Sequence, residues 1–214
     1  MSDIKVCIVD YGLGNHQSVV NALSFLGYDC SVSGRESDMA KADVLILPGV
    51  GSFAEGMKNI RQAGLELILK DQVLEKKKLF LGICLGMQLL ADDSLENGHH
   101  KGLGWIKGSV IKLEGSDKVR VPHVGWNSLD IRQKDPFFNL SDARANYYFD
   151  HSYHYQCSDE FVSAYTSVGS NIAAAIQKGN IFGVQFHPEK SHNNGLKLLR
   201  SFFNGAEAKR MSHA

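Results

Sequence analysis

The sequence has no excess of charge of either sign. Its 23 lysines and arginines match its 23 aspartates and glutamates over 214 residues, so the formal net charge is zero. A balanced chain lacks the overall field that draws a protein to phosphate backbones or to anionic membranes. We therefore expect a protein that binds neither nucleic acid nor a membrane.

Long apolar runs and paired cysteines are also missing. The longest mostly apolar stretch, residues 79–91, is well short of the roughly 20 residues that cross a bilayer. Residues 1–9 lack the basic segment, apolar run and cleavage site of an export signal. The cysteines at positions 7, 30, 84 and 157 form no C-x-x-C pair, which argues against a disulfide framework. These absences predict a cytoplasmic protein.

Metal-ligand patterns are incomplete as well. The pair His151-x-x-His154 lacks a third ligand at a recognisable spacing, and His99 and His100 stand in a polar loop. We assign no metal site.

What the chain does have is an alternation of short aliphatic runs with helix-period segments. In the first half this alternation predicts strands at 5–9, 28–32, 44–47 and 79–83 and helices at 16–26 and 63–75. The second half predicts strands at 105–113, 119–121, 147–149, 161–166, 172–176 and 181–185 and a last helix at 195–203. We expect a single α/β domain over 1–206, with a central mixed, mainly parallel sheet flanked by helices, and a polar tail over 207–214.

Cys84 stands where an apolar strand meets a helix, with Gly82 and Gly86 two residues to either side. This is the nucleophile-elbow pattern with cysteine in place of serine, in which a tight turn leaves no room for flanking side chains. The following helix N-terminus favours a thiolate, and the backbone N–H of Leu85 is left to bind an oxyanion. A lone cysteine in an apolar run is more often a buried core residue, but the two glycines favour the elbow.

His187 and Glu189 offer partners for this cysteine at the end of a later strand. Pro188 keeps His187 extended, and residues two apart on an extended chain project to the same side, so Glu189 can orient the imidazole. Alone, His-Pro-Glu is more typical of a structural histidine. Together with the elbow it predicts a Cys84, His187, Glu189 triad.

Two further segments lie close to this chemistry. Glycines flank Val50 where another central strand ends, and the Val50–Gly51 backbone is a candidate for a second N–H to an oxyanion. An ordinary strand-to-helix turn would look much the same. Gln88 lies one helical turn after Cys84 and faces the same side, where its amide can reach a substrate, unless it is a plain surface glutamine.

These residues resemble the triad-type, class I glutamine amidotransferases, a family with a flavodoxin-like fold, and the resemblance covers nearly the whole chain. Within the family the motifs are most similar to those of the glutaminase subunits of imidazole glycerol phosphate synthases. The segments that carry this narrower resemblance are 10–15 (DYGLGN), 48–53 (PGVGSF), 122–127 (PHVGWN), 151–153 (HSY) and 187–191 (HPEKS).

The resemblance implies that Cys84 attacks the side-chain amide of glutamine, that His187 protonates the departing ammonia, and that water hydrolyses the thioester. It also implies that Val50 and Gly51 form a mobile oxyanion strand. Glutamine would be held by Gly51, Gln88, Ser152 and Tyr153, with Glu96 a weaker candidate. No cofactor is implied.

A separate ammonia acceptor is implied too. In the resembled subfamily it is a cyclase subunit with a TIM-type barrel, which forms a heterodimer with the glutaminase and closes an imidazole ring in histidine biosynthesis. The docking surface would include Gly12, Asn15, Pro122, Trp126, Tyr148 and Lys190.

Three other functions remain open. Close paralogues pass ammonia to a sugar-modifying enzyme of surface-polysaccharide synthesis and share every catalytic motif, and Asp150 stands before His151 where the subfamily usually has an apolar residue. A non-catalytic interaction subunit would leave the complete triad unused. A free-standing cysteine peptidase or amidase would not explain the segments 122–127 and 151–153.

Overall fold

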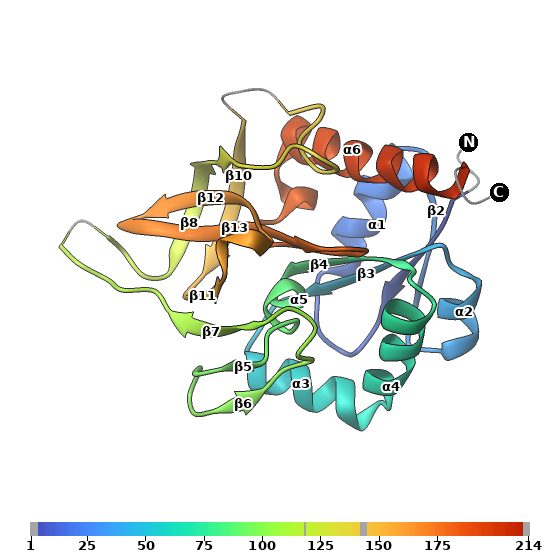
Figure 1. The fold of residues 1–214 in the computed structure, drawn as a ribbon, viewed down its shortest axis with the longest axis horizontal. Helices are drawn as coiled ribbons and strands as arrows, with labels where there is room; N and C mark the ends of the chain where they lie inside the picture. Colours follow the sequence, from blue (N-terminus) through green and yellow to red (C-terminus); the bar gives the residue numbers. More distant parts are fainter. Residues whose placement is uncertain (1–3, 118, 142–144, 212–214) are drawn as a thin grey trace.

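The centre of the protein is a mixed β-sheet. A computed structural model describes residues 4–117, 119–141 and 145–211. Within these residues the largest sheet has eight strands (Figure 1), in the order β2 (Asp29–Ser33), β1 (Lys5–Val9), β3 (Val44–Gly49), β4 (Leu79–Cys84), β14 (Ile181–Val184), β13 (Ser170–Lys178), β12 (Val162–Val168) and β9 (Asp130–Ile131). Strands β2 to β14 of this order are parallel, and the rest are antiparallel.

Helices cover both faces of the sheet (Figure 1). Helices α1 (His16–Phe25) and α6 (His192–Met211) lie on one face. The other face carries α2 (Glu36–Lys41), α3 (Phe53–Gln62) and α4 (Leu65–Lys70), which continues as a π-helical turn at Asp71–Glu75. Successive residues of a strand point to opposite faces, so Val6 and Ile8 enter the core under α1 while Cys7 and Val9 enter the core under α3.

Two small sheets and several short turns complete the fold. One sheet pairs β8 (His123–Ser128) with β10 (Asn146–His151), and the other has the order β11 (Tyr153–Cys157), β7 (Gly108–Lys112), β5 (Asp93–Ser94) and β6 (His100–Lys101). Short helical segments are α5 (Leu85–Gln88) and the 3₁₀ turns Asp159–Phe161 and Pro188–Lys190. No helix in the described part of the chain is long and apolar enough to cross a membrane.

The structure confirms the predicted fold class, one α/β domain around a mixed sheet, and most of the predicted strands of the central sheet. The helix predicted at 63–75 begins at Leu65 and ends in the π-helical turn. The last helix is longer than predicted and runs to Met211, so residues 207–211 of the expected tail are helical, whereas 212–214 lie outside the described residues.

Some predicted strands were wrong, and some elements of the structure were not predicted. Residues 119–121 form no strand, since Val119 makes only an isolated bridge with Ser116, and the strand predicted at 105–113 is confined to β7. Strand β8 was missed because its alternation is reversed: Val124 and Trp126 are exposed, while the alternate residues His123, Gly125 and Asn127 are half-buried. Helix α3 was missed as well, although Ser52 accepts a capping hydrogen bond at its start.

Lys78 joins the start of β4 to the end of α2. Its Nζ donates to the carbonyl oxygens of Met39 at 2.8 Å and of Ala40 and Ala42 at 2.6 Å each. Carbonyls at a helix C-terminus have no partner within the helix, and a cation there is favourable. The ammonium therefore fixes the turn that leads into the central strand β3.

The Lys78→Met substitution removes this donor while keeping a side chain of similar length. We expect the free energy of unfolding to fall by about 1–2 kcal/mol, because three carbonyls lose a charged donor and two of those bonds are partly buried. Urea denaturation measures the difference. Lys77→Met, at the exposed neighbouring position, is the matched control, and equal midpoints for both variants would contradict the assignment.

Candidate active site

Cys84 is the last residue of β4 and occupies a strained backbone position directly before α5. Its φ of 53° and ψ of −109° lie in a region that residues with a side chain rarely adopt. Neither flanking position has room for a side chain, because a Cβ on Gly86 would overlap the carbonyl oxygen of Leu47 and one on Gly82 would collide with the backbone of Gly86. The two glycines thus allow the sharp turn that the elbow pattern predicts.

His187 and Glu189 lie beside Cys84, just after strand β14. The Nδ1 atom of His187 is 2.8 Å from Oε1 of Glu189, and both side chains are almost completely buried. Two hydrogen bonds fix the backbone of His187. Its N–H donates to the carbonyl of Tyr148 at 2.8 Å, and the Ser191 hydroxyl donates to its carbonyl at 2.6 Å. The structure therefore brings the three predicted triad residues together.

The electrostatics of this group favour a protonated histidine. Burial lowers the pKa of His187, but hydrogen bonds and attraction from Cys84 and Glu189 outweigh burial and raise that pKa to about 10. A histidine held in this state beside a cysteine is suited to stabilise a thiolate and later to donate a proton to a leaving group.

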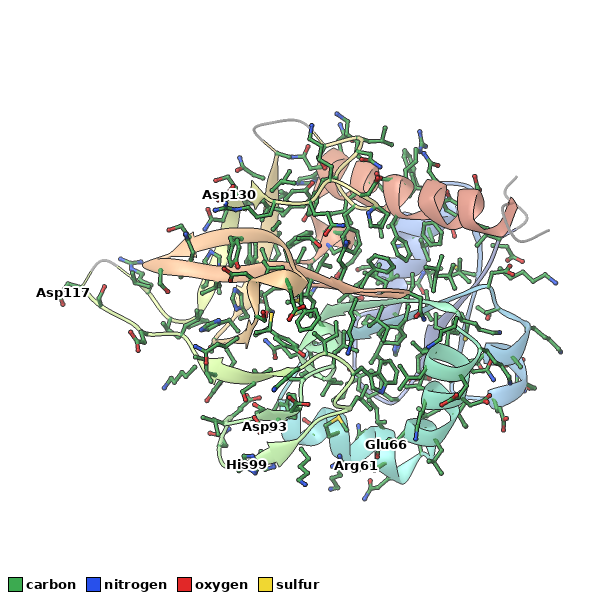
Figure 2. The ribbon with its side chains drawn as sticks, viewed as in Figure 1. Arg61, Glu66, Asp93, His99, Asp117 and Asp130 are labelled. Carbon is green, nitrogen blue, oxygen red and sulfur yellow. The ribbon has the colours of Figure 1, made fainter. Side chains whose placement is uncertain are left out.

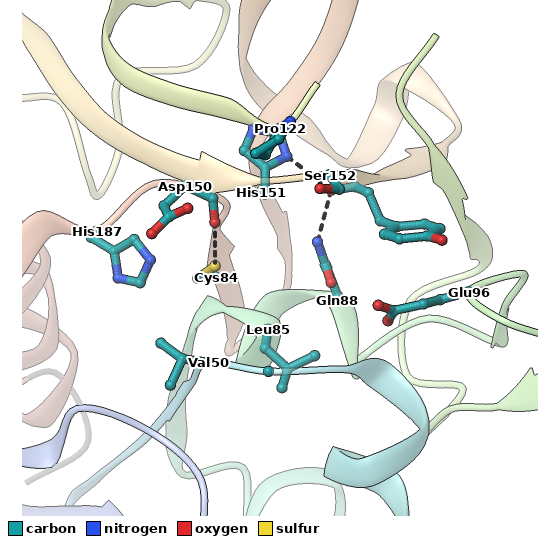
Figure 3. Close-up of a pocket in the computed structure, with 12 residues that line it drawn as sticks. Val50, Cys84, Leu85, Gln88, Glu96, Pro122, Asp150, His151, Ser152 and His187 are labelled. Carbon is teal, nitrogen blue, oxygen red and sulfur yellow. Dashed lines mark hydrogen bonds between the residues drawn. The ribbon is translucent and has the colours of Figure 1, made fainter. Parts of the chain in front are cut away.

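A cavity of about 340 Å³ opens above Cys84 (Figure 3). Its wall contains nine of the residues predicted for catalysis or substrate binding: Val50, Gly51, Cys84, Leu85, Gln88, Glu96, Ser152, Tyr153 and His187. Segments far apart in the sequence thus meet around one sulfur atom.

The Val50–Gly51 segment follows directly on strand β3. In the register of the sheet Gly49 lies opposite Cys84, so this segment leaves the sheet beside the nucleophile. Val50 is 41% exposed, and Gly51 has a φ of 114°, a conformation that suits glycine. Its place on the cavity wall is compatible with the predicted oxyanion role.

Gln88 and Glu96 are held at the cavity by hydrogen bonds of their own. The Gln88 Nε2 atom donates to the carbonyl of Tyr153 at 2.9 Å and to Oε1 of Gln185 at 3.0 Å, which fixes the amide orientation. Oε2 of Glu96 accepts from the backbone N–H of Phe53 at 2.7 Å and ties the rim to the start of α3.

Sequence reasoning missed several residues of the site. Gln185 is buried, and its Nε2 atom donates to Sγ of Cys84 at 3.7 Å. Asp150 and His151 line the cavity, and the backbone oxygen of Asp150 lies 4.0 Å from the same sulfur. Gln185 could have been found by its position two residues before His187, at the end of the strand that the sequence predicts at 181–185. Pro122, predicted for the partner surface, also lines the cavity.

Three of the predicted interface residues form one aromatic and basic surface. Trp126 is 48% exposed and lies opposite Tyr148 in the β8–β10 register, and Lys190 Nζ lies 5.7 Å from the centre of the Tyr148 ring. Gly12 and Asn15 are exposed in the turn before α1, where Asn15 caps the helix.

Of the histidines considered for metal binding, His151 and His154 line different cavities. His99 Nε2 lies 3.1 Å from Oδ2 of Asp93 at the surface (Figure 2). Across the described ranges no group of three or more histidine, cysteine, aspartate and glutamate side chains is arranged to hold a metal ion.

A strained cysteine beside a buried histidine and glutamate, at the carboxyl end of a strand in an α/β sheet, is the arrangement found in enzymes that use a cysteine nucleophile. Comparison with known proteins gives its family. The model of the family "Glutamine amidotransferase class-I" matches residues 7–206. The chain belongs to this family, as its motifs suggested.

The chain is also similar in sequence to particular members of this family. "Imidazole glycerol phosphate synthase subunit HisH 1" of Campylobacter jejuni subsp. jejuni serotype O:23/36 (strain 81-176) is 46% identical over 197 residues, which are 92% of this chain and 98% of that protein. "Imidazole glycerol phosphate synthase subunit HisH" of Oceanobacillus iheyensis is 44% identical over 198 residues, 92% of this chain and 97% of that protein.

Solved structures agree on the fold. PurLQS from Thermotoga maritima superimposes with a TM-score of 0.74 at 23% identity, over 95% of this chain and 99% of that one. A putative GMP synthase protein from Thermoplasma acidophilum also has a TM-score of 0.74, at 19% identity, over 100% of this chain and 98% of that one.

The Glu189→Gln substitution tests the charge that acts on His187. It keeps a hydrogen-bond acceptor but removes a negative charge, so we expect the pKa of His187 to fall from about 10 toward the ordinary value of imidazole. Titration of isotope-labelled histidine by NMR measures the shift. Glu160→Gln, at an exposed position, should leave the titration unchanged. An unaltered His187 titration in Glu189→Gln would contradict the account.

Proposed function

We propose that the protein hydrolyses glutamine to glutamate and ammonia and passes the ammonia to a cyclase subunit. The complex would form imidazole glycerol phosphate and AICAR in histidine biosynthesis. The observation that carries this proposal is the meeting of Cys84 and His187 at one cavity, with Glu189 in contact with the His187 ring, in a chain 46% identical to a subunit of imidazole glycerol phosphate synthase.

The reaction starts with attack of the Cys84 sulfur on the side-chain carbonyl carbon of glutamine. The carbonyl oxygen gains negative charge, and the backbone N–H of Leu85 and the Val50–Gly51 segment are the donors to stabilise it. His187 gives its proton to the amide nitrogen, the C–N bond breaks, and ammonia leaves a glutamyl thioester on Cys84.

Hydrolysis of the thioester completes the cycle. Neutral His187 now takes a proton from water, the hydroxide oxygen bonds to the acyl carbon, and the C–S bond breaks to release glutamate and the Cys84 thiolate. Glu189 touches neither water nor substrate, and it orients the imidazole through the 2.8 Å contact. Each step is assigned to groups of the chain itself, so we propose no cofactor.

Substrate glutamine carries an α-ammonium and an α-carboxylate group on the same carbon, and its side chain ends in a neutral amide. The Glu96 carboxylate at the rim has the charge to bind the α-ammonium group. Gly51, Gln88, Ser152 and Tyr153 line the remaining wall, where backbone and side-chain polar groups can fix the rest of the molecule.

The partner we propose is a cyclase with a TIM-type barrel, in a cytoplasmic heterodimer. Trp126, Tyr148 and Lys190 would face it, together with the exposed turn of Gly12 and Asn15. Aromatic side chains such as those of Trp126 and Tyr148 are typical anchors of protein interfaces. Pro122 lines the cavity, is exposed and directly precedes β8, which carries Trp126, so it would contribute to both the cavity and this surface.

A second acceptor, a sugar in surface-polysaccharide synthesis, has one observation in its favour. Asp150, which lines the cavity, stands before His151 where the resembled subfamily usually has an apolar residue. Both acceptors require the same glutaminase chemistry and differ only in the partner.

Glutamate release from glutamine tests the proposal directly. The purified chain is assayed alone, with a co-purified cyclase subunit, and with that subunit plus its ribulosyl ligand, and we expect strong stimulation by the ligand-bound cyclase. The control Cys84→Ala should abolish release while it still binds the cyclase.

Activity that ignores the cyclase would move the proposal to the sugar acceptor. Hydrolysis of peptides by the chain alone would favour a peptidase. No release in any mixture would contradict the enzymatic function and favour an interaction subunit.

A further inference from the structure

Two side chains of the cavity wall contact the carbonyl oxygen of Tyr153. It accepts a hydrogen bond from Nε2 of Gln88 at 2.9 Å, and Nδ1 of His151 lies 2.8 Å from it. All three residues line the cavity. In Figure 3 Gln88 points up to this wall from α5, while His151 comes from the opposite side. The orientation of the Gln88 amide thus depends on where the Tyr153 carbonyl is held.

A chain of hydrogen bonds continues from His151 toward strand β8. Nε2 of His151 lies 3.0 Å from Nδ1 of His123, and Nε2 of His123 lies 3.4 Å from Nδ2 of Asn127. Two further hydrogen bonds fix the Asn127 amide: Nδ2 donates to the carbonyl of Ser167 at 3.0 Å, and Oδ1 accepts from the backbone N–H of Ser128 at 2.9 Å.

This chain determines the tautomer of both rings. A carbonyl oxygen only accepts hydrogen bonds, so Nδ1 of His151 carries a proton. Nε2 of the neutral ring is then an acceptor, and it accepts a hydrogen bond from the N–H group at Nδ1 of His123. Nε2 of His123 accepts from the Asn127 amide. Every ring nitrogen has a complementary partner when both histidines are neutral and protonated at Nδ1.

The surroundings favour these neutral rings. His151 is only 6% exposed, and burial lowers its pKa to about 3, although the Tyr153 carbonyl acts in the opposite direction. Burial lowers the pKa of His123 as well. Both nitrogens of His151 are occupied by protein atoms, so the ring offers no polar atom to a substrate.

We propose that His151 is a positioning residue for the glutamine site: it holds the Tyr153 carbonyl where that oxygen orients Gln88, and His123 with Asn127 holds the His151 ring. The proposal rests on the glutaminase function proposed above. His151 acts on the shape of the binding wall and not on the reacting atoms, so its loss should weaken glutamine binding more than it slows turnover.

Two substitutions separate this role from a general structural one. In the assembled, ligand-stimulated complex, His151→Phe fills the space but removes both hydrogen bonds, and we expect the KM for glutamine to rise about tenfold while kcat changes less than about threefold. His151→Asn restores a donor at the position of Nδ1, and its KM should return to within about threefold of the wild type. His154→Asn is the matched control, because His154 lines a different cavity, and it should have the wild-type KM.

A double substitution tests the link to β8. If His123 acts only through His151, the KM of the double variant His123→Ala/His151→Phe should equal that of His151→Phe alone. A further increase in the double variant would overturn the part assigned to His123.

The wild-type protein provides a measurement that needs no variant and no activity. NMR of isotope-labelled histidine at neutral pH should show both His151 and His123 neutral and protonated at Nδ1. A charged ring, or protonation at Nε2, would overturn the proposal, and so would a wild-type KM in His151→Phe or a loss confined to kcat. An inactive wild-type complex with the expected tautomers would instead contradict the glutaminase function and leave the positioning geometry intact.

Discussion

The strained backbone of Cys84 is the constraint on which the rest of the site depends. A residue with φ of 53° and ψ of −109° persists only where its neighbours leave no alternative. Here the sheet supplies that restraint, because β4 is paired on both sides, with β3 and β14. Gly86 packs so closely against the Leu47 carbonyl that no other residue fits. The sulfur is thereby fixed at the carboxyl end of a central strand, where the cavity forms.

The same pairing assembles residues that are distant in the sequence. Carboxyl ends of parallel strands meet at one edge of a sheet, so β3 delivers the Val50–Gly51 segment and β14 delivers His187 to the two sides of Cys84. Strand β10 stabilises this arrangement, since the carbonyl of Tyr148 accepts a hydrogen bond from the backbone N–H of His187. The cavity is therefore a consequence of sheet order, and its lining comes from loops that the sheet brings together.

Local sequence patterns were enough to predict the parts of the site that are defined by steric rules. The glycines around Cys84 and the two-residue spacing of His187 and Glu189 have meaning without any tertiary information, and the structure places these residues together. Alternating apolar runs likewise predicted the parallel half of the sheet. Residues whose part depends on contacts across the fold were missed: Gln185 is an ordinary glutamine until the structure places it against the sulfur.

Elements with unusual exposure were missed for a related reason. Strand β8 turns Val124 and Trp126 outward and polar His123 and Asn127 inward, so the hydrophobic pattern gives no strand signal. That reversal has a structural basis, because the inward side chains form the hydrogen-bond chain to His151. Departures from simple patterning thus coincide with the cavity wall and with the surface proposed for the partner.

The central claim is that Cys84 is a nucleophile in a cavity shaped for glutamine. Incubation of the partner-bound protein with a diazoketone analogue of glutamine, followed by peptide mass spectrometry, tests this claim most directly. The account predicts one covalent adduct, on Cys84, whose formation is slowed by added glutamine. Labelling that spreads over Cys7, Cys30 and Cys157, or that glutamine does not slow, would contradict it.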